Sequence, residues 1–398
     1  MNKTIHIGTP EIRNNGGFCE LHALIRTDET EYDMWYRVEK EYGQYLTAER
    51  ADAFIVALLP YALSHSLDIE SSQVMSAKLY HQLKGYLIPA LAKFTKAYHP
   101  IELRSRLCHD ELPNAGAVGT GMSGGVDSYY TILKNYNTEN SAYNLTHLTF
   151  FNVGSHGDNG GEKARELFKK RITDAKANAE HLGLPLVIVD SNISEYLMMD
   201  HLATHTYRSC SAVLALQKLF AVYLFSSGHD LTEFCVSSEV CASHDILNVH
   251  CLATENTDFY LSGLQERRID KELFLADQKE ARERLNVCVV DEHNCSRCEK
   301  CLRTMIGLYA LGRLDDFSAV FDVEDFKGNL AKRLGFMVGR LHKNSYREAR
   351  DEMRKRKLRI PFMAYVYGAP LYIKESFRPL YEKDGFLART WKKIRHIK

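Results

Sequence analysis

The chain has 398 residues, of which 45% are hydrophobic and 26% are charged. This length predicts two or three folded units, and the composition excludes a disordered or fibrous protein. Lys+Arg and Asp+Glu both number 51, so no net charge attracts the whole protein to nucleic acid or to anionic lipid.

The cysteines and the apolar segments indicate the cellular compartment of the protein. No segment approaches the ~20 consecutive apolar residues of a membrane-spanning helix, and the first residues lack the apolar core of a signal peptide. Six of the ten cysteines are scattered and four lie within residues 288–301. This pattern is typical of reduced thiols plus one metal site. We therefore expect a cytoplasmic protein without a membrane partner.

Residues 1–112 are expected to form an N-terminal α+β domain. Short alternating stretches predict strands, and apolar residues at three- and four-residue spacing predict helices. The predicted strands are 4–8, 20–26, 34–38 and 101–107, and the predicted helices are 51–66 and 76–97.

Residues 113–315 alternate between strand and helix patterns. The strands are expected at 117–122, 145–153, 186–190, 233–237 and 259–263, and the helices at 126–136, 163–182 and 211–225. Such alternation indicates an α/β fold with a doubly wound, mainly parallel sheet, which binds ligands beyond the carboxyl ends of its strands.

Residues 316–398 are expected to form a helical, basic C-terminal region, with helices at 326–341 and 345–356. Residues 331–398 contain 19 Lys/Arg and 6 Asp/Glu. The basic runs are 354–357 and Lys392, Lys393 and Arg395. They fit either a solvated helix face or a surface that contacts nucleic acid or an acidic partner.

A glycine-rich loop is expected where the strand 117–122 gives way to a helix. Its sequence is Ser-Gly-Gly-Val-Asp-Ser, residues 123–128. Gly124 and Gly125 let the backbone approach a ligand, and the helix N-terminus presents free amides to an anion. The loop has no P-loop lysine. An overlapping GxGxxG, residues 119–124, lacks the acidic residue at the next strand's end that a dinucleotide site needs.

Four cysteines are spaced as ligands of one metal centre. Cys288, Cys295, Cys298 and Cys301 are separated by six, two and two residues. Tetrahedral Zn²⁺ takes four such thiolates, and an iron–sulfur cluster is built from the same ligands, so the spacing leaves both open.

The 123–128 loop resembles the signature of the PP-loop ATP pyrophosphatase superfamily, whose members split ATP into AMP and pyrophosphate. The segment 294–305, with three of the cysteines, is similar to a motif in the 7-cyano-7-deazaguanine synthase family. The resemblance covers residues 117–311. It implies a PP-loop core that binds ATP and Mg²⁺, with a structural zinc ion on the four cysteines in preference to iron.

The resemblance also implies roles for single residues. Ser123, Gly124, Gly125, Val126 and Ser128 would hold the pyrophosphate end of ATP, Asp127 would support the loop or Mg²⁺, and Phe151 and Asn152 would read adenine. Arg268 and Lys271 would reach the phosphates, unless they are an exposed basic pair on a helix.

Two further residues are candidates on chemical grounds. Arg208 could hold a carboxylate or phosphate by two parallel hydrogen bonds, or it could be a structural arginine. Glu239 follows a predicted strand and could bind Mg²⁺ or a substrate amine.

The resemblance implies an ATP-dependent ligase. It would adenylate a small-molecule acceptor, expected to be a carboxylate, release pyrophosphate, and release AMP when ammonia or an amine attacks. Two alternatives stay open: a PP-loop sulfurtransferase that thiolates RNA or a small molecule, and a catalytically inactive nucleotide-binding regulatory protein. The oligomeric state is open as well, a homo-oligomer included.

Overall fold

The computed structural model describes residues 3–381, which form two compact units. The first unit comprises Met1–Ser123 and Asp127–Gln265, and the second comprises Gly124–Val126 and Glu266–Lys398. The boundaries expected at 112/113 and 315/316 therefore fall inside these units. The basic residues Lys392, Lys393 and Arg395 lie outside the described residues.

The first unit is built on one mixed, mostly parallel sheet of eleven strands. The strand order is β13-β12-β9-β10-β11-β4-β3-β1-β5-β7, and β2 pairs with β3. The strands are β1 Thr4–Ile7, β2 Glu11–Asn15, β3 Phe18–Arg26, β4 Glu31–Glu39, β5 Asp68–Ser71, β7 Leu103–Arg104, β9 Ala117–Gly121, β10 His147–Asn152, β11 Leu186–Ser191, β12 Phe220–Ser226 and β13 Asp258–Ser262. β6 Met75–Ser76 and β8 Leu107–Cys108 form a separate two-stranded sheet.

The predicted α/β class with a mainly parallel sheet is confirmed, but the N-terminal strands do not form a sheet of their own. β4 pairs antiparallel with β11 and places Arg37 opposite Asp190. The strands β9 to β13 are parallel to one another, and the antiparallel pairs all involve β3 or β4. Sequence periodicity identifies strands but not their partners, and pairing with β4 satisfies the backbone groups along the edge of β11.

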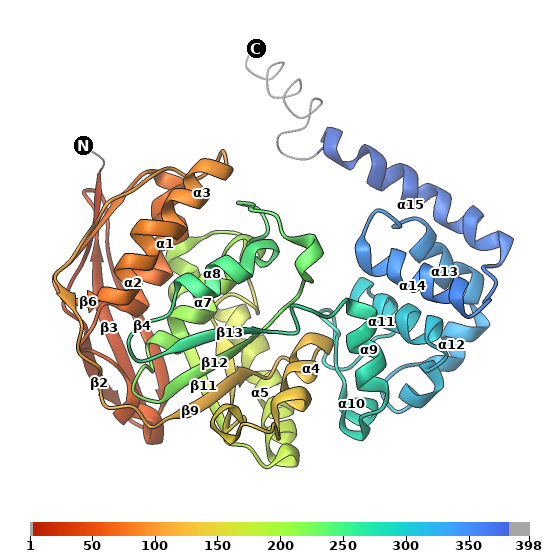
Figure 1. Ribbon diagram of the computed structural model, residues 1–398, viewed down its shortest axis with the longest axis horizontal. Helices are drawn as coiled ribbons and strands as arrows, with labels where there is room; N and C mark the ends of the chain where they lie inside the picture. Colours follow the sequence, from red (N-terminus) through yellow and green to blue (C-terminus); the bar gives the residue numbers. More distant parts are fainter. Residues whose placement is uncertain (1–2, 382–398) are drawn as a thin grey trace, which may run out of the picture. The chain divides into compact units, whose positions relative to one another are not determined.

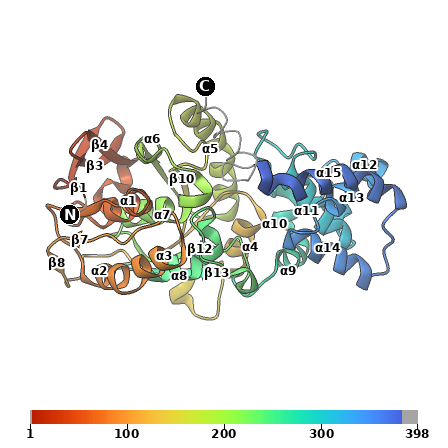
Figure 2. The ribbon, with the colours of Figure 1, turned by 90° about the horizontal axis from the view of Figure 1, so that it is seen from above.

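Helices cover the sheet of the first unit. They are α1 Asp52–His65, α2 Ala77–Gln82, α3 Ile88–Phe94, α4 Val126–Asn135, α5 Glu162–Leu182, α6 Ile193–Leu197, α7 His201–Leu214 and α8 Asp245–Cys251. α1 and α7 lie side by side (Figures 1 and 2), and α5 packs against β10 and β11. The helix predicted over 76–97 is α2 and α3 joined by a π-helical turn. α1 is buried on almost every side, which explains why it is apolar all round.

The prediction of a helix over 211–225 and a strand over 233–237 is wrong. The structure instead places α7 at His201–Leu214 and the strand β12 at Phe220–Ser226. β12 lies inside the sheet and is covered on both faces, so it lacks the polar alternation that marks a half-buried strand. A short 3₁₀ turn, Leu231–Glu233, and irregular chain take the place of the expected strand.

The second unit is helical. Its helices are α9 Arg268–Ala276, α10 Lys279–Arg284, α11 Glu299–Ala310, α12 Val323–Gly328, α13 Leu330–Val338, α14 Asn344–Lys355 and α15 Phe362–Tyr381. α11 packs against α9, α13 and α14, and α13 packs against α15. Within residues 3–381, no helix combines the length and the apolar character needed to cross a bilayer.

Three glycines let α13 and α15 approach closely. A Cβ built on Gly335 would lie 2.7 Å from Tyr367 Cβ and 3.0 Å from the Ala364 carbonyl oxygen. A Cβ on Gly339 would lie 2.6 Å from Leu371 Cβ, and a Cβ on Gly368 of α15 would lie 2.8 Å from the Gly335 carbonyl oxygen. Side chains at these positions would push the two helices apart.

We therefore expect Gly335→Ala to destabilise the second unit although alanine favours helices over glycine. The overpacked contact should cost about 1–3 kcal/mol in the free energy of unfolding, measured by urea denaturation. Gly328→Ala is the matched control, because a Cβ there meets nothing within 4 Å. A Gly335→Ala protein as stable as the wild type would show that the close approach is not needed.

Candidate functional site

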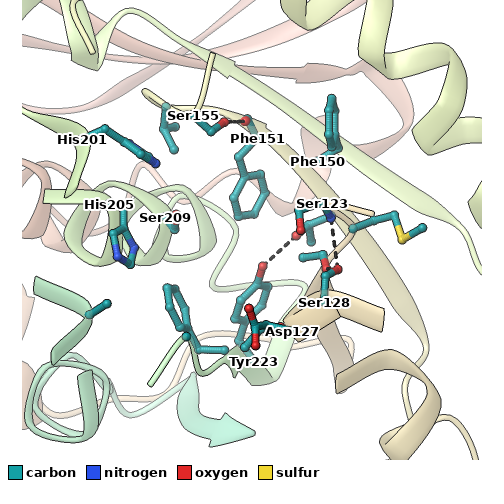
Figure 3. A pocket seen from close by; sticks show the side chains of 18 residues that line it. Ser123, Asp127, Ser128, Phe150, Phe151, Ser155, His201, His205, Ser209 and Tyr223 are labelled. Atoms are coloured by element: carbon teal, nitrogen blue, oxygen red, sulfur yellow. Dashed lines mark hydrogen bonds between the residues drawn. The ribbon is translucent and has the colours of Figure 1, made fainter. Parts of the chain in front are cut away.

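A cavity of about 320 Å³ lies at the carboxyl ends of β9, β10 and β12 (Figure 3). These strands end at Gly121, Asn152 and Ser226. β9 pairs in parallel with β10 on one side and with β12 on the other, so it is the point where the chain's progression across the sheet reverses. Ligands of open α/β sheets bind at such switch points.

The 123–128 loop forms one wall of the cavity through Ser123, Asp127 and Ser128. The Ser128 hydroxyl donates to the Gly121 carbonyl oxygen at 2.5 Å and accepts from the Ser123 amide at 3.1 Å. Ser128 is 4% exposed, so its hydroxyl braces the loop from inside. Gly124 has φ 77°, in the left-handed region that glycine adopts without strain.

Aromatic rings form a second wall. Phe151 stacks on Tyr223 with ring centroids 6.3 Å apart, and Phe225 also lines the cavity. The Tyr223 hydroxyl hydrogen-bonds Thr149 at 2.7 Å, which fixes the ring against the end of the sheet. These flat apolar surfaces suit a planar ring better than a flexible chain.

One face of α7 forms the third wall. His201, His205 and Ser209 are four residues apart, so they lie on one side of the helix and line the cavity (Figure 3). Burial disfavours the charged imidazole of His205, but Cys241, which hydrogen-bonds it, and the buried Asp245 carboxylate outweigh this effect and raise the pKa of His205 to about 9. At neutral pH, His205 therefore presents a positive charge.

Arg208 lies on another face of α7 and does not line the cavity. It is fully buried and donates to the Asp158 and Met199 carbonyl oxygens at 3.1 and 2.7 Å and to Ser194 Oγ at 3.0 Å. Burial lowers the pKa of Arg208 to about 10, so the side chain is still charged at neutral pH. In this position Arg208 links the chain that follows β10 to the chain that follows β11. Its predicted contact with substrate stays a prediction.

The other predicted residues of the first unit are dispersed. Phe151 lines the cavity with its ring, whereas the amide of Asn152 donates to Asp190 on β11 at 2.7 Å. Glu239 is exposed on the irregular chain after the 3₁₀ turn and is not among the residues that line the cavity. Asp127 is the carboxylate that the loop itself presents there.

Arg268 and Lys271 belong to the second unit. Arg268 Nε donates to Glu272 Oε1 at 3.0 Å, and its Nη2 donates to Thr304 Oγ1 at 3.2 Å. Lys271 is 2% exposed. The two residues therefore do not form an exposed basic pair on a helix, which was the alternative to phosphate binding. Their contact with phosphate stays a prediction.

The four cysteines converge in the second unit. The sulfur atoms of Cys288, Cys295, Cys298 and Cys301 all lie within 4.8 Å of one another, close enough to bind a metal ion such as zinc. A tetrahedral ion with Zn–S bonds of about 2.3 Å needs sulfurs about 3.8 Å apart. The Cys288 and Cys298 sulfurs are 4.0 Å apart.

Backbone amides donate to two of the four sulfurs and favour the ionised form of Cys288, whereas burial raises the pKa of the Cys295 and Cys301 thiols. The Asp291 amide donates to Cys288 Sγ and the Cys298 amide donates to Cys295 Sγ, each at 3.3 Å. Burial raises the pKa of the Cys288 thiol, but the amide hydrogen bonds outweigh it and lower the pKa to about 7. Cys288 is thus prepared to act as a thiolate ligand.

The basic run 354–357 lies at the end of α14 and is exposed. Arg354 pairs with Asp351, and Lys355 and Arg356 both pair with Glu352. These local ion pairs favour the solvated helix face over a contact surface for an acidic partner.

Sequence reasoning missed the α7 wall and the β12 aromatic residues. Tyr223 and Phe225 were not predicted as site residues because the strand that carries them was predicted as a helix. The i, i+4 spacing of His201 and His205 was a readable signal once a helix began at residue 201. No family model, no curated protein and no solved structure matches the chain.

His156 makes the chain that follows β10 sensitive to acid. Its ring packs against Phe150 and Phe168, with centroids 5.4 and 5.1 Å away, and it contacts Ser155, which lines the cavity. Burial, aided by the charge of Arg171, lowers the pKa of His156 from 6.5 to about 4.

The unfolded chain therefore binds a proton at this histidine below pH 6.5, and the folded chain does so only below about pH 4. We expect His156 to remove about 2 kcal/mol of stability between pH 7 and pH 5. Measured by urea denaturation, the His156→Phe protein should lose about 2 kcal/mol less unfolding free energy between pH 7 and pH 5 than the wild type loses. His109→Phe, at an exposed histidine, is the control; an equal loss in all three proteins would contradict the assignment.

Proposed function

We propose that the protein is an ATP-dependent ligase that adenylates an acceptor carboxylate and releases pyrophosphate, then AMP on attack by ammonia or an amine. The observation that carries the proposal is the 123–128 loop at a cavity where the sheet order reverses. A glycine-rich loop that leads into a helix N-terminus is suited to bind phosphate, and the cavity provides room beside it for an acceptor.

The loop would bind the phosphates and Asp127 would hold Mg²⁺. Because the Ser128 hydroxyl already joins Gly121 to Ser123, the loop needs little rearrangement to present its backbone to an anion. The aromatic wall of Phe151, Tyr223 and Phe225 offers a surface for the adenine ring. Magnesium would supply charge neutralisation at the phosphates.

Positive charge on the opposite wall supports the same chemistry. His205 is charged at neutral pH and faces the cavity, whereas Arg208 is directed elsewhere. Adenylation brings a carboxylate close to the α-phosphate of ATP, and a fixed cation reduces the repulsion between these two anions.

We assign a structural zinc ion to the four cysteines. A cubane cluster would place four irons and four sulfides between the thiolates and would hold the sulfurs further apart than one ion does. The mutual sulfur distances within 4.8 Å support a single ion. All ten cysteines are free of disulfides, which supports a location in the reducing cytoplasm.

The sulfurtransferase alternative requires a sulfur-carrying group that reaches the acceptor. Among the described residues that line the cavity there is no cysteine, which favours ammonia or an amine as the nucleophile. The inactive regulatory protein is disfavoured because the loop keeps both serines, both glycines and Asp127.

Asp127→Asn tests the nucleotide site. We expect it to weaken MgATP binding about tenfold and to lower AMP formation about a hundredfold, because the carboxylate that would hold Mg²⁺ is lost. Calorimetry measures the binding, and chromatography measures AMP with ammonium and a mixture of small carboxylates.

Asp28→Asn is the matched control, since Asp28 is exposed in the turn after β3. It should behave as the wild type. A wild-type protein that does not bind MgATP, or an Asp127→Asn protein that binds it equally well, would contradict the proposal.

Metal analysis tests the cysteine site separately. We expect one zinc per chain in the purified protein, loss of that zinc in Cys298→Ala, and a lower unfolding midpoint in this variant because the ion joins 288–301 to α11. Cys235→Ala, at an exposed cysteine outside the cluster, should retain the zinc. Iron with visible absorption in the wild type would instead support the sulfurtransferase.

A further inference from the structure

Helix α15 is attached to the second unit by one narrow stripe. Ala364, Gly368 and Leu371 face α13, where Gly335 and Gly339 allow the close approach described above. Glu375 continues the stripe and pairs with Arg340 at 3.3 Å. The spacing of four, three and four residues keeps all four residues on one side of the helix.

A second apolar stripe lies on the opposite side of α15. It consists of Phe362, Val366, Ala369, Ile373 and Phe377, again at spacings of three and four residues; we call it the α15 seam. Phe362 is 79% exposed, Ile373 56% and Phe377 50%. An apolar seam of this period is typical of a helix that packs against a second helix.

The exposed area matches the size of a stable interface. The α15 seam carries four large exposed side chains, and Met363, Tyr365 and Tyr372 flank it on the helix surface; these seven side chains are 45–79% exposed. Large apolar side chains bury roughly 150–250 Å² each when covered, so half-exposed ones leave about 100 Å² each, or about 700 Å² together. A standard-size interface buries about 800 Å² per partner.

The charges favour a protein surface over an anionic membrane or nucleic acid. The α15 seam contains no ionisable residue, and Glu375 is directed to Arg340 on the opposite side. Lys374 is the one basic residue within 362–377, and Arg354, Lys355 and Arg356 at the end of α14 are paired with Asp351 and Glu352. An interfacial membrane helix needs a basic face beside its apolar one.

We propose that the α15 seam pairs with the same seam of a second copy of this chain, as two antiparallel helices related by a two-fold axis near Ala369. This arrangement places Val366 beside Tyr372 of the other copy and Tyr365 beside Ile373. The small side chain of Ala369 lets the helices approach at the axis, and the same patch serves both copies, as closed two-fold symmetry requires.

The first test is the mass of the full chain in solution. Light scattering after size exclusion at micromolar concentration should give twice the 45.5 kDa of one chain. Val366→Glu combined with Ile373→Glu should raise the dimer dissociation constant about a hundredfold or more, because two charges are placed in the apolar seam. Far-ultraviolet circular dichroism shows whether this variant is folded.

Phe94→Glu is the control, since Phe94 is 65% exposed at the end of α3 in the first unit. It should leave the dimer intact. A monomeric wild type, or a dimer that persists in the seam variant, overturns the proposal. Flotation of a monomeric wild type with phosphatidylglycerol vesicles would also overturn it and assign the seam to a lipid surface.

Cross-linking tests the antiparallel geometry. Ala369→Cys should form an intermolecular disulfide on mild oxidation, because the two copies of residue 369 meet at the axis. Ser376→Cys should not, because seven residues displace it by about 10 Å from the axis in opposite directions in the two copies. Cross-linking of both variants would indicate parallel helices and overturn this arrangement.

Discussion

The site depends on the parallel pairing of β9 with both β10 and β12. Parallel strands bring their carboxyl ends to one edge of the sheet, and the reversal of strand order at β9 leaves no crossover helix above that edge. Three parts of the chain meet at this edge: the loop after β9, the aromatic residues of β10 and β12, and helix α7, which precedes β12. They meet because the strands to which they belong or connect end at this edge. The order of the strands therefore determines which residues line the cavity.

Helix α7 packs into the fold with one face and lines the cavity with another. Arg208 and Tyr207 are buried, and Arg208 holds neighbouring segments by two hydrogen bonds to backbone carbonyl oxygens and one to the Ser194 hydroxyl. His205 faces the cavity, and the interactions with Cys241 and Asp245 outweigh burial and raise its pKa. A rigid helix whose back is fixed in this way holds a charged ring in place without reorganisation, which is the condition under which a fixed charge acts most strongly on a ligand.

Local signals in the sequence predicted the elements that short stretches determine. The strand–loop–helix at 117–136, the helix ending at Leu182 and the convergence of the four cysteines were all readable, because each depends on residues close together in the chain. β12 was not readable, since burial on both faces removes its alternation. The direction of the Arg208 side chain was not readable either, because it depends on carbonyl groups of Asp158 and Met199, from other segments.

The pairing of β4 with β11 has a consequence for how this chain can be divided. Residues 1–112 look like a removable module in the sequence, yet their strands continue the hydrogen bonding of the strands that form the cavity. A chain that began at residue 113 would expose the edge of β11 at Val189, Asp190 and Ser191, which pair with β4. The unpaired backbone groups of an open strand edge can pair with another chain. The N-terminal strands therefore also protect the sheet from aggregation.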